Sequence, residues 1–356
     1  MVKTPLGLAV IIAVSASRLL AQGQPHVEPH PKPQRDPLYA SVRLDSALRP
    51  YRPIVAVAGE IRGAHQDVLT WLTESWTTAF KKIHPGAEFG LRVENTRSAM
   101  ANLEPGAAQF VTAGRGLQDP DREAFRRKNG ADYDPLRIAV AGGTYRTPGQ
   151  EDTVVFFVNE DNPLDRISLA QLDAMYSTTR RRGYKQDLRT WGQLGLTGEW
   201  ADQPIILWST TAPNGYEVLL REQVLLGGKL KEGIHTRDHI FPMPYLVGLS
   251  PHSIGFASLS VIESCPQMHV KPLAIAESDG GPYYKGTFEE VLAQTYPLSR
   301  AIYIYVHRPP GQPLNPKLKE FLRFILSRDG QRAVMNDGIY LPLPARIVEQ
   351  ELAKLE

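Results

Sequence analysis

The 356-residue sequence offers few groupings of side chains that could do chemistry. His235 and His239 are four residues apart with Asp238 between them, and on a helix this spacing could hold a metal ion. No third ligand can be named, so an exposed loop is the favoured interpretation. His252 and Ser253 are adjacent, which gives no nucleophile–base geometry by itself. A secreted hydrolase that uses the two spaced histidines therefore remains only as an alternative.

Sequence motifs of enzymes give no further support for catalysis. The chain contains no G-x-S-x-G, no P-loop and no dinucleotide-binding fingerprint. Its single cysteine, Cys265, allows neither an intramolecular disulfide nor a cysteine-based metal cluster. We therefore predict a non-catalytic protein that needs no metal and no cofactor.

The charge balance argues against nucleic acid as a partner. The sequence has 40 basic and 38 acidic residues, which give a formal net charge of +2. Nucleic acid and anionic membranes usually require a concentrated basic field. Two short basic runs, RRK at 126–128 and RRR at 180–182, are interpreted as solvated faces, because short charge runs usually are.

The N-terminus has the layout of a secretory signal peptide. Lys3 provides a positive start, an apolar run extends from Leu6 to Val14, and small residues follow up to Ala21. The apolar run is shorter than the roughly 20 residues that a membrane span needs. We predict a signal peptide at 1–21 and a soluble protein that is periplasmic or secreted after cleavage.

The rest of the pattern is typical of an α/β protein. A proline-rich arm at 22–50 is expected to be extended or disordered rather than packed, because proline fixes φ and removes a donor. Asp67 is a candidate N-cap for the first helix. The expected strands lie at 54–58, 89–93, 109–113, 153–159, 205–209, 254–257 and 301–307, and the expected helices at 67–83, 99–103, 168–176, 216–226, 316–326 and, as the final one, from about 329 to before 338. The alternation implies parallel sheet with covering helices.

Six segments in order carry a family resemblance. They are WTTAFKKIHPG at 76–86, GAAQFVTAGRGL at 106–117, VVFFVNEDNP at 154–163, the helix at 168–177 with WGQL at 191–194, IGFAS at 254–258, and YPLSRAIYIY at 296–305 with LSRDGQRAVMNDGIYLPLP at 326–344. In these residues the chain resembles the phosphate-type periplasmic solute-binding proteins of bacterial ABC transporters. The resemblance implies the two-lobed periplasmic binding protein type 2 fold, with mixed sheets flanked by helices and a ligand cleft between the lobes.

The resemblance also implies an organisation and a set of partners. Lobe I would comprise 51–142 plus 300–356, and lobe II would comprise 143–299. The expected protein is a monomer that captures a small inorganic oxyanion, phosphate or a related anion, for a membrane ABC permease. A ligand-free homologue with a sensory or scaffold role is the alternative.

The family binds its oxyanion with three loops, and the resemblance assigns candidates to each. Backbone N–H groups at helix N-termini, small hydroxyls and an arginine surround a desolvated anion. The candidate ligand-binding residues are Gln66 and Asp67 in the first loop, Thr96 and Ser98 in the second, Arg115 after the third strand, and Asn214 and Gly215 in the third loop. The alternative role of Arg115 is an ion pair across the lobe, and that of Asp67 is a plain helix cap.

The loops also depart from the family pattern. The second loop reads NTRSA at 95–99 where the family has G-S-G-S-G, Thr210 stands where the family has an arginine, and NGY at 214–216 replaces S-G-T. Each lost hydrogen bond to a charged group costs about 1.5–3 kcal/mol. Two or three such losses would weaken phosphate binding by several powers of ten unless other groups compensate. The sequence therefore predicts weak capture by the standard contacts, or a different ligand.

Overall fold

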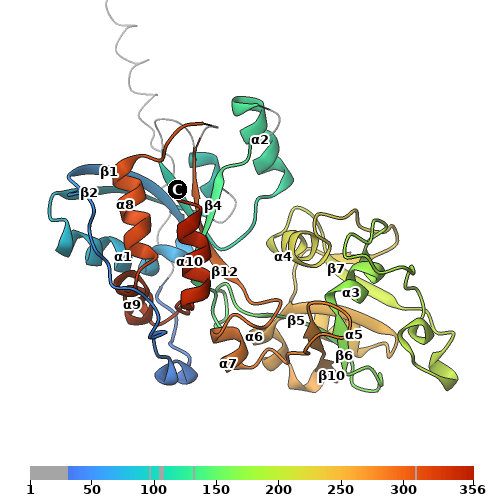
Figure 1. Cartoon of the computed structure of the whole chain (residues 1–356). Coiled ribbons are helices and arrows are strands. Elements are labelled where there is room, and N and C mark those ends of the chain that lie inside the picture. The colour runs from blue at the N-terminus through green and yellow to red at the C-terminus, as the bar shows by residue number, and fades with distance from the viewer. Residues whose placement is uncertain (1–30, 96–97, 104–107, 131–132, 309–310) are drawn as a thin grey trace, which may run out of the picture.

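The computed structural model describes residues 31–95, 98–103, 108–130, 133–308 and 311–356 (Figure 1). The chain forms two lobes that lie side by side, each built around a five-stranded mixed sheet. No helix within these ranges is both long enough and apolar enough to cross a membrane. The α/β two-lobed fold expected from the sequence is confirmed.

The sheet of the first lobe has the strand order β2-β1-β3-β12-β4. Its strands are β1 (Gly59–Gln66), β2 (Ala87–Glu94), β3 (Phe110–Ala113), β4 (Leu136–Gly142) and β12 (Ala301–Val306). β1 pairs in parallel with β2 and β3, whereas β12 pairs antiparallel with β3 and β4. Because β12 lies near the C-terminus, the chain returns to the first lobe after it has built the second.

Aromatic side chains dominate the core of the first lobe. Its helices are α1 (Thr70–Ile83), α2 (Asp119–Asn129), α8 (Pro316–Ile325), α9 (Arg328–Asp337) and α10 (Ala345–Ala353), with the 3-10 turns η3 (Asp67–Leu69) and η4 (Ala99–Asn102). Phe80 of α1 and Phe321 of α8 are fully buried, with ring centroids 5.2 Å apart. Burying such a side chain contributes about 1.5–3 kcal/mol. Because α10 follows α9, the prediction that the helix near 329–338 is the final one was wrong.

The sheet of the second lobe has the order β10-β5-β9-β7-β8. Its strands are β5 (Val154–Asn159), β7 (Ile206–Thr210), β8 (His235–Arg237), β9 (Ser253–Ser258) and β10 (Val270–Pro272), and β6 (Arg166–Ser168) pairs separately with β11 (Ala274–Ala276). Every residue of β5 and β9 is buried, which explains the uninterrupted apolar run at 154–158.

Short helices surround this second sheet. They are α3 (Leu169–Tyr176), α4 (Gly215–Leu219) with its π-helical continuation η7 (Leu220–Val224), α5 (Met243–Gly248), α6 (Leu259–Glu263) and α7 (Phe288–Leu292), with the 3-10 turns η5 (Trp191–Leu194), η6 (Gly198–Trp200) and η8 (Pro266–Met268). The predicted cap of α3 is confirmed, because the Ser168 hydroxyl oxygen accepts a hydrogen bond from the Gln171 backbone N–H at 3.1 Å.

The first predicted strand, at 54–58, was wrong. Ile54 is 72% exposed, and the strand begins instead at Gly59, which pairs with Ala87 of β2. The true strand is poor in large apolar residues because its neighbours fill the space. A Cβ on Gly63 would lie 2.3 Å from the Phe110 ring.

The part of the N-terminal arm that the structure describes packs against the body, contrary to expectation. Tyr39, in the 3-10 turn η2 (Pro37–Ser41), is buried, and its hydroxyl donates to the carbonyl oxygen of Tyr340 at 2.5 Å. Asp36 pairs with Arg146 at 2.9 Å. The contacts of Tyr39 and Asp36 therefore hold this proline-rich segment against the body of the protein.

Candidate ligand-binding site

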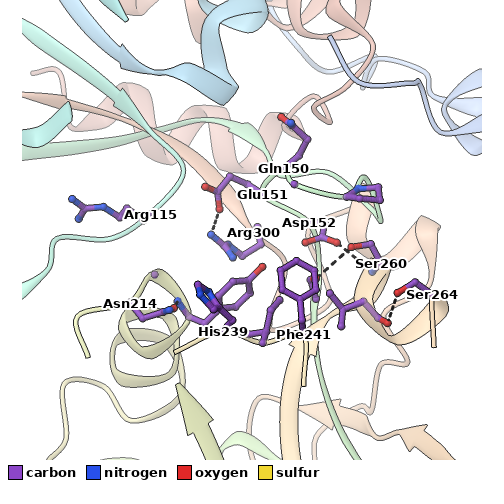
Figure 2. Close-up of a pocket in the computed structure, with 17 residues that line it drawn as sticks. Arg115, Gln150, Glu151, Asp152, Asn214, His239, Phe241, Ser260, Ser264 and Arg300 are labelled. Carbon is purple, nitrogen blue, oxygen red and sulfur yellow. Dashed lines mark hydrogen bonds and ion pairs between the residues drawn. The ribbon is translucent and has the colours of Figure 1, made fainter. Parts of the chain in front are cut away.

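A cavity of about 370 Å³ lies between the lobes (Figure 2). The segments that cross from one lobe to the other form part of its wall, and they run together because the Gly143 backbone N–H donates to the Arg300 carbonyl oxygen at 2.8 Å. The lining comprises Arg115, residues 148–152, residues 214–216, residues 239–241, Ser258, Ser260, Val261, Ser264 and Arg300.

A buried ion pair between Glu151 and Arg300 dominates this wall (Figure 2). The Arg300 Nη2 donates to Glu151 Oε2 and, at 2.9 Å, to the carbonyl oxygen of Gly114. Burial raises the pKa of Glu151, while the positive charges of Arg300 and Arg115 oppose that rise. Among the residues that the structure describes, the hydrogen bonds of the Arg300 side chain all come from Nη2. Its Nε and Nη1 groups can therefore donate to a ligand.

Gly114 allows the ion pair to lie against the end of β3. A Cβ at this position would lie 2.2 Å from Cγ of Glu151. The Gly114 backbone N–H donates to Gln66 Oε1 at 3.0 Å. The ends of β1 and β3 therefore meet the crossing segment at this point.

Asp152 is a second buried carboxyl group in the cavity wall. Its Oδ2 accepts a hydrogen bond from the Ser260 backbone N–H at 3.2 Å. Burial raises the pKa of Asp152 to about 7, although hydrogen bonds from Ser260 and the charge of Arg300 oppose the rise. Near neutral pH, part of the Asp152 population is protonated and can donate a hydrogen bond to a ligand.

Aromatic and apolar groups complete the cavity. The Arg300 guanidinium carbon lies 5.6 Å from the ring centroid of Tyr216, within cation–π range. Ile240, Phe241 and Val261 supply the apolar part of the lining.

Ion pairs outside the cavity join the two lobes. The Arg221 Nη1 of η7 contacts both carboxylate oxygens of Asp119 in α2, at 2.6 and 2.7 Å. The Glu222 carboxylate accepts hydrogen bonds from Nη2 of Arg122 in α2 at 2.5 Å and from Nη1 of Arg137 in β4 at 3.0 Å. These interlobe ion pairs hold α2 and β4 of the first lobe against η7 of the second.

Comparison with known proteins assigns the chain to a family. A family model described as a PBP superfamily domain matches residues 56–329. The phosphate-binding protein PstS of two Pseudomonas aeruginosa strains is 31% identical over 316 residues, covering 89% of this chain and 93% of the relative. The chain belongs to the PBP superfamily, in the family of PstS. A crystal structure of PstS from Borrelia burgdorferi has a TM-score of 0.50 at 14% identity, covers 80% of this chain and 98% of its own, and shows the same fold.

Three residues predicted from the sequence line the cavity of this PBP-superfamily chain: Arg115, Asn214 and Gly215. Gly215 is the first residue of α4, and Asn214 caps that helix. The Asn214 Oδ1 accepts from the Tyr216 backbone N–H at 2.9 Å, and its Nδ2 donates to the Asp238 carbonyl oxygen at 3.0 Å. Part of the hydrogen-bonding capacity of this amide is thus used by the protein itself.

Arg115 is only 3% exposed and forms an ion pair within its own lobe. Its Nη1 lies 2.5 Å from Oδ2 of Asp121, and the guanidinium points away from Arg300 (Figure 2). An ion pair was the alternative role for this arginine, and a direct ligand contact stays a prediction.

The remaining candidates are not in the cavity lining, as far as the described residues go. The Ser98 hydroxyl donates to Glu94 Oε2 at 2.8 Å, and Thr96 lies outside the described residues. Gln66 is buried behind Gly114. Asp67 begins η3, where its Oδ1 accepts from the Val68 backbone N–H at 2.9 Å. The prediction that Asp67 is the N-cap of α1 was wrong, because this 3-10 turn comes before the helix.

Sequence reasoning missed Glu151, Asp152 and Arg300. Arg300 belongs to the YPLSR segment, which carried the resemblance without being assigned to the site. The two acids lie just before β5, separated by Thr153 from its apolar run at 154–158. Two charged residues just before a buried strand were the available sequence signal for a functional site.

The two histidines do not form a metal site. His235 lies in β8, an exposed strand rather than a helix, and its ring is 4.9 Å from that of Trp208. Helical spacing therefore does not bring His235 and His239 together. The described part of the chain holds no group of three or more His, Cys, Asp or Glu residues that could bind a metal ion.

Proposed function

We propose that this protein is an exported solute-binding protein that captures a small oxyanion, phosphate or a related anion, for an ABC-type importer. The observation that carries the proposal is the match over 89% of the chain to relatives named phosphate-binding protein. Those relatives also support a binding role rather than catalysis. Periplasmic or secreted location rests on the signal-peptide pattern at 1–21, which lies outside the described residues.

The proposed organisation is a monomer with lobe I at 51–142 plus 300–356 and lobe II at 143–299. The strands of the two five-stranded sheets fall within these ranges, which supports the boundaries. Hinged movement of the lobes would open the cavity to solvent and close it around the ligand, the usual behaviour of such proteins. The closed form would then dock on the membrane permease.

Arg300 is the proposed anchor for the oxyanion. Its Nε and Nη1 groups can form charge-assisted hydrogen bonds to an anion while Nη2 stays on Glu151. Protonated Asp152 would add a donor in the same wall. Arg115 is the second candidate, provided that its guanidinium turns away from Asp121.

Thermal-shift and calorimetric titrations with phosphate, sulfate, molybdate and phosphonates test this proposal. A ligand that binds the native state raises the melting temperature. We expect a shift with at least one tetrahedral oxyanion, lost in Arg300→Gln. If Arg115→Ala also abolishes the shift, both arginines hold the ligand. A shift unchanged in both variants would rule out this cavity as the binding site.

One observation favours a second candidate, a homologue that has lost its ligand. Both arginines of the cavity are already paired with carboxylates of the protein, Arg300 with Glu151 and Arg115 with Asp121. A ligand anion must therefore compete with internal anions. This candidate would be favoured if calorimetric titration of the folded wild type gave no binding heat with any oxyanion, while titration of Glu151→Gln with phosphate did give heat.

A further inference from the structure

A second cavity, of about 890 Å³, lies at the interface between the lobes. Leu117, just beyond the loop that carries Arg115, contributes to its wall. Five arginines line it, and we call this cavity the arginine basin. They are Arg122 and Arg126 of α2, Arg137 of β4, Arg181 after α3, and Arg221 of η7.

The arginine basin unites residues that are far apart in the sequence. Arg126 and Arg181 belong to the two short basic runs that the sequence alone suggests are solvated faces. The fold brings one residue of each run to the same cavity, from opposite lobes. Arg181 is held there because its Nη1 donates to the carbonyl oxygen of Leu226 at 2.9 Å.

Positive charge in the arginine basin exceeds the negative charge that faces it. The lining has five arginines against two carboxylates, Asp134 and Glu222, and 5 − 2 leaves +3. Asp119 and Glu217 contact Arg221 without lining the cavity, and counting them as well leaves +1. Each guanidinium has five N–H donors, so these ion pairs leave many donors for a ligand.

We propose that the arginine basin binds a condensed phosphate, an anion of two or more linked phosphate groups. A single tetrahedral ion can reach only some of five guanidinium groups spread around about 890 Å³. A chain of phosphates offers several oxyanion groups, and the planar guanidinium binds such groups in bidentate fashion. A cleft whose lining carries a net positive charge also concentrates such anions.

This site goes beyond the proposed capture of a small oxyanion, because it shares no lining residue with the cavity at Arg300. Its arginines come from both lobes. A bound condensed phosphate would therefore bridge the lobes beside the interlobe ion pairs.

Calorimetric titration of the full chain with inorganic tripolyphosphate at low ionic strength tests the proposal. The test variant is Arg126→Ala/Arg181→Ala, chosen because both side chains lie at the exposed rim. The control is Arg127→Ala/Lys185→Ala, which removes the same charge from exposed positions outside the lining. Melting temperatures confirm that both variants are folded.

We expect one tripolyphosphate per chain, at least about tenfold weaker affinity in the test variant, and little change in the control. Added salt should weaken binding, because these charges are partly exposed. The proposal fails if the wild type does not bind tripolyphosphate, or if the control loses as much affinity as the test variant. It also fails if Arg300→Gln abolishes binding and the test variant does not, whereas loss of orthophosphate binding alone bears only on the proposed function.

Discussion

Replacing Asp152 by asparagine should change how the stability of the protein depends on pH. Asp152 is 1% exposed, and burial raises its pKa from 3.8 to about 7. Between these values the native state holds more protons than the unfolded chain. The free energy of unfolding must therefore fall as the pH rises through this window.

The size of the effect follows from the pKa difference. From 3.8 to about 7 is about three pH units, and each unit corresponds to about 1.4 kcal/mol, so full ionisation of Asp152 costs about 4 kcal/mol. Between pH 5 and pH 8 the wild type should lose about 2–3 kcal/mol more than the Asp152→Asn variant. Asparagine keeps an oxygen that can accept from the Ser260 N–H and has no proton to lose.

Urea unfolding of both proteins at pH 5, 6, 7 and 8, with linear extrapolation to water, measures the difference. Burial also raises the pKa values of Glu151 and Asp337, with the same sign of effect on stability. Both groups remain in the variant, so subtracting the two pH profiles isolates Asp152. Parallel profiles would refute the reasoning, since they would show that Asp152 ionises in the native state as readily as in the unfolded chain.

Two further substitutions test the packing around the cavity, and a third tests the ion pairs between the lobes. Arg300→Met leaves the buried Glu151 carboxylate unpaired and should lower the free energy of unfolding by about 3–5 kcal/mol in urea titrations; a loss below about 1 kcal/mol would contradict a buried pair. Gly114→Ala places a Cβ 2.2 Å from Cγ of Glu151 and should lower the melting temperature, whereas an unchanged value would show that Glu151 lies elsewhere. Glu222→Gln weakens two interlobe ion pairs and should increase the radius of gyration in small-angle scattering, most clearly at low salt; an unchanged radius would mean that these pairs do not hold the lobes together.

The parts of the fold that could be predicted are those with strong local patterns. The uninterrupted apolar run of β5 and the Ser168 cap of α3 are visible in the sequence and occur as expected. The strand β1 has no such pattern. Only glycine fits at position 63, because the Phe110 ring of a neighbouring strand occupies the space of a side chain. The sequence does not show which residue will be that neighbour.

The candidate site was harder to predict because its contacts are tertiary. Glu151 and Arg300 are 149 positions apart in the sequence, and only the tertiary fold brings them into contact. The family pattern drew attention to Arg115, which lines the cavity, but not to Asp121, which forms an ion pair with its guanidinium. Likewise, neither Arg126 nor Arg181 has a local signal for the cavity that they share.

A crystal structure of the protein grown with arsenate tests the proposed binding site most directly. Arsenate is a tetrahedral analogue of phosphate, and its arsenic atom can be located by anomalous scattering. We predict an anomalous peak in the cavity between the lobes, with arsenate oxygens within hydrogen-bonding distance of Nε or Nη1 of Arg300. An empty cavity at saturating arsenate, with Glu151 and Arg300 still paired, would contradict oxyanion capture at this site.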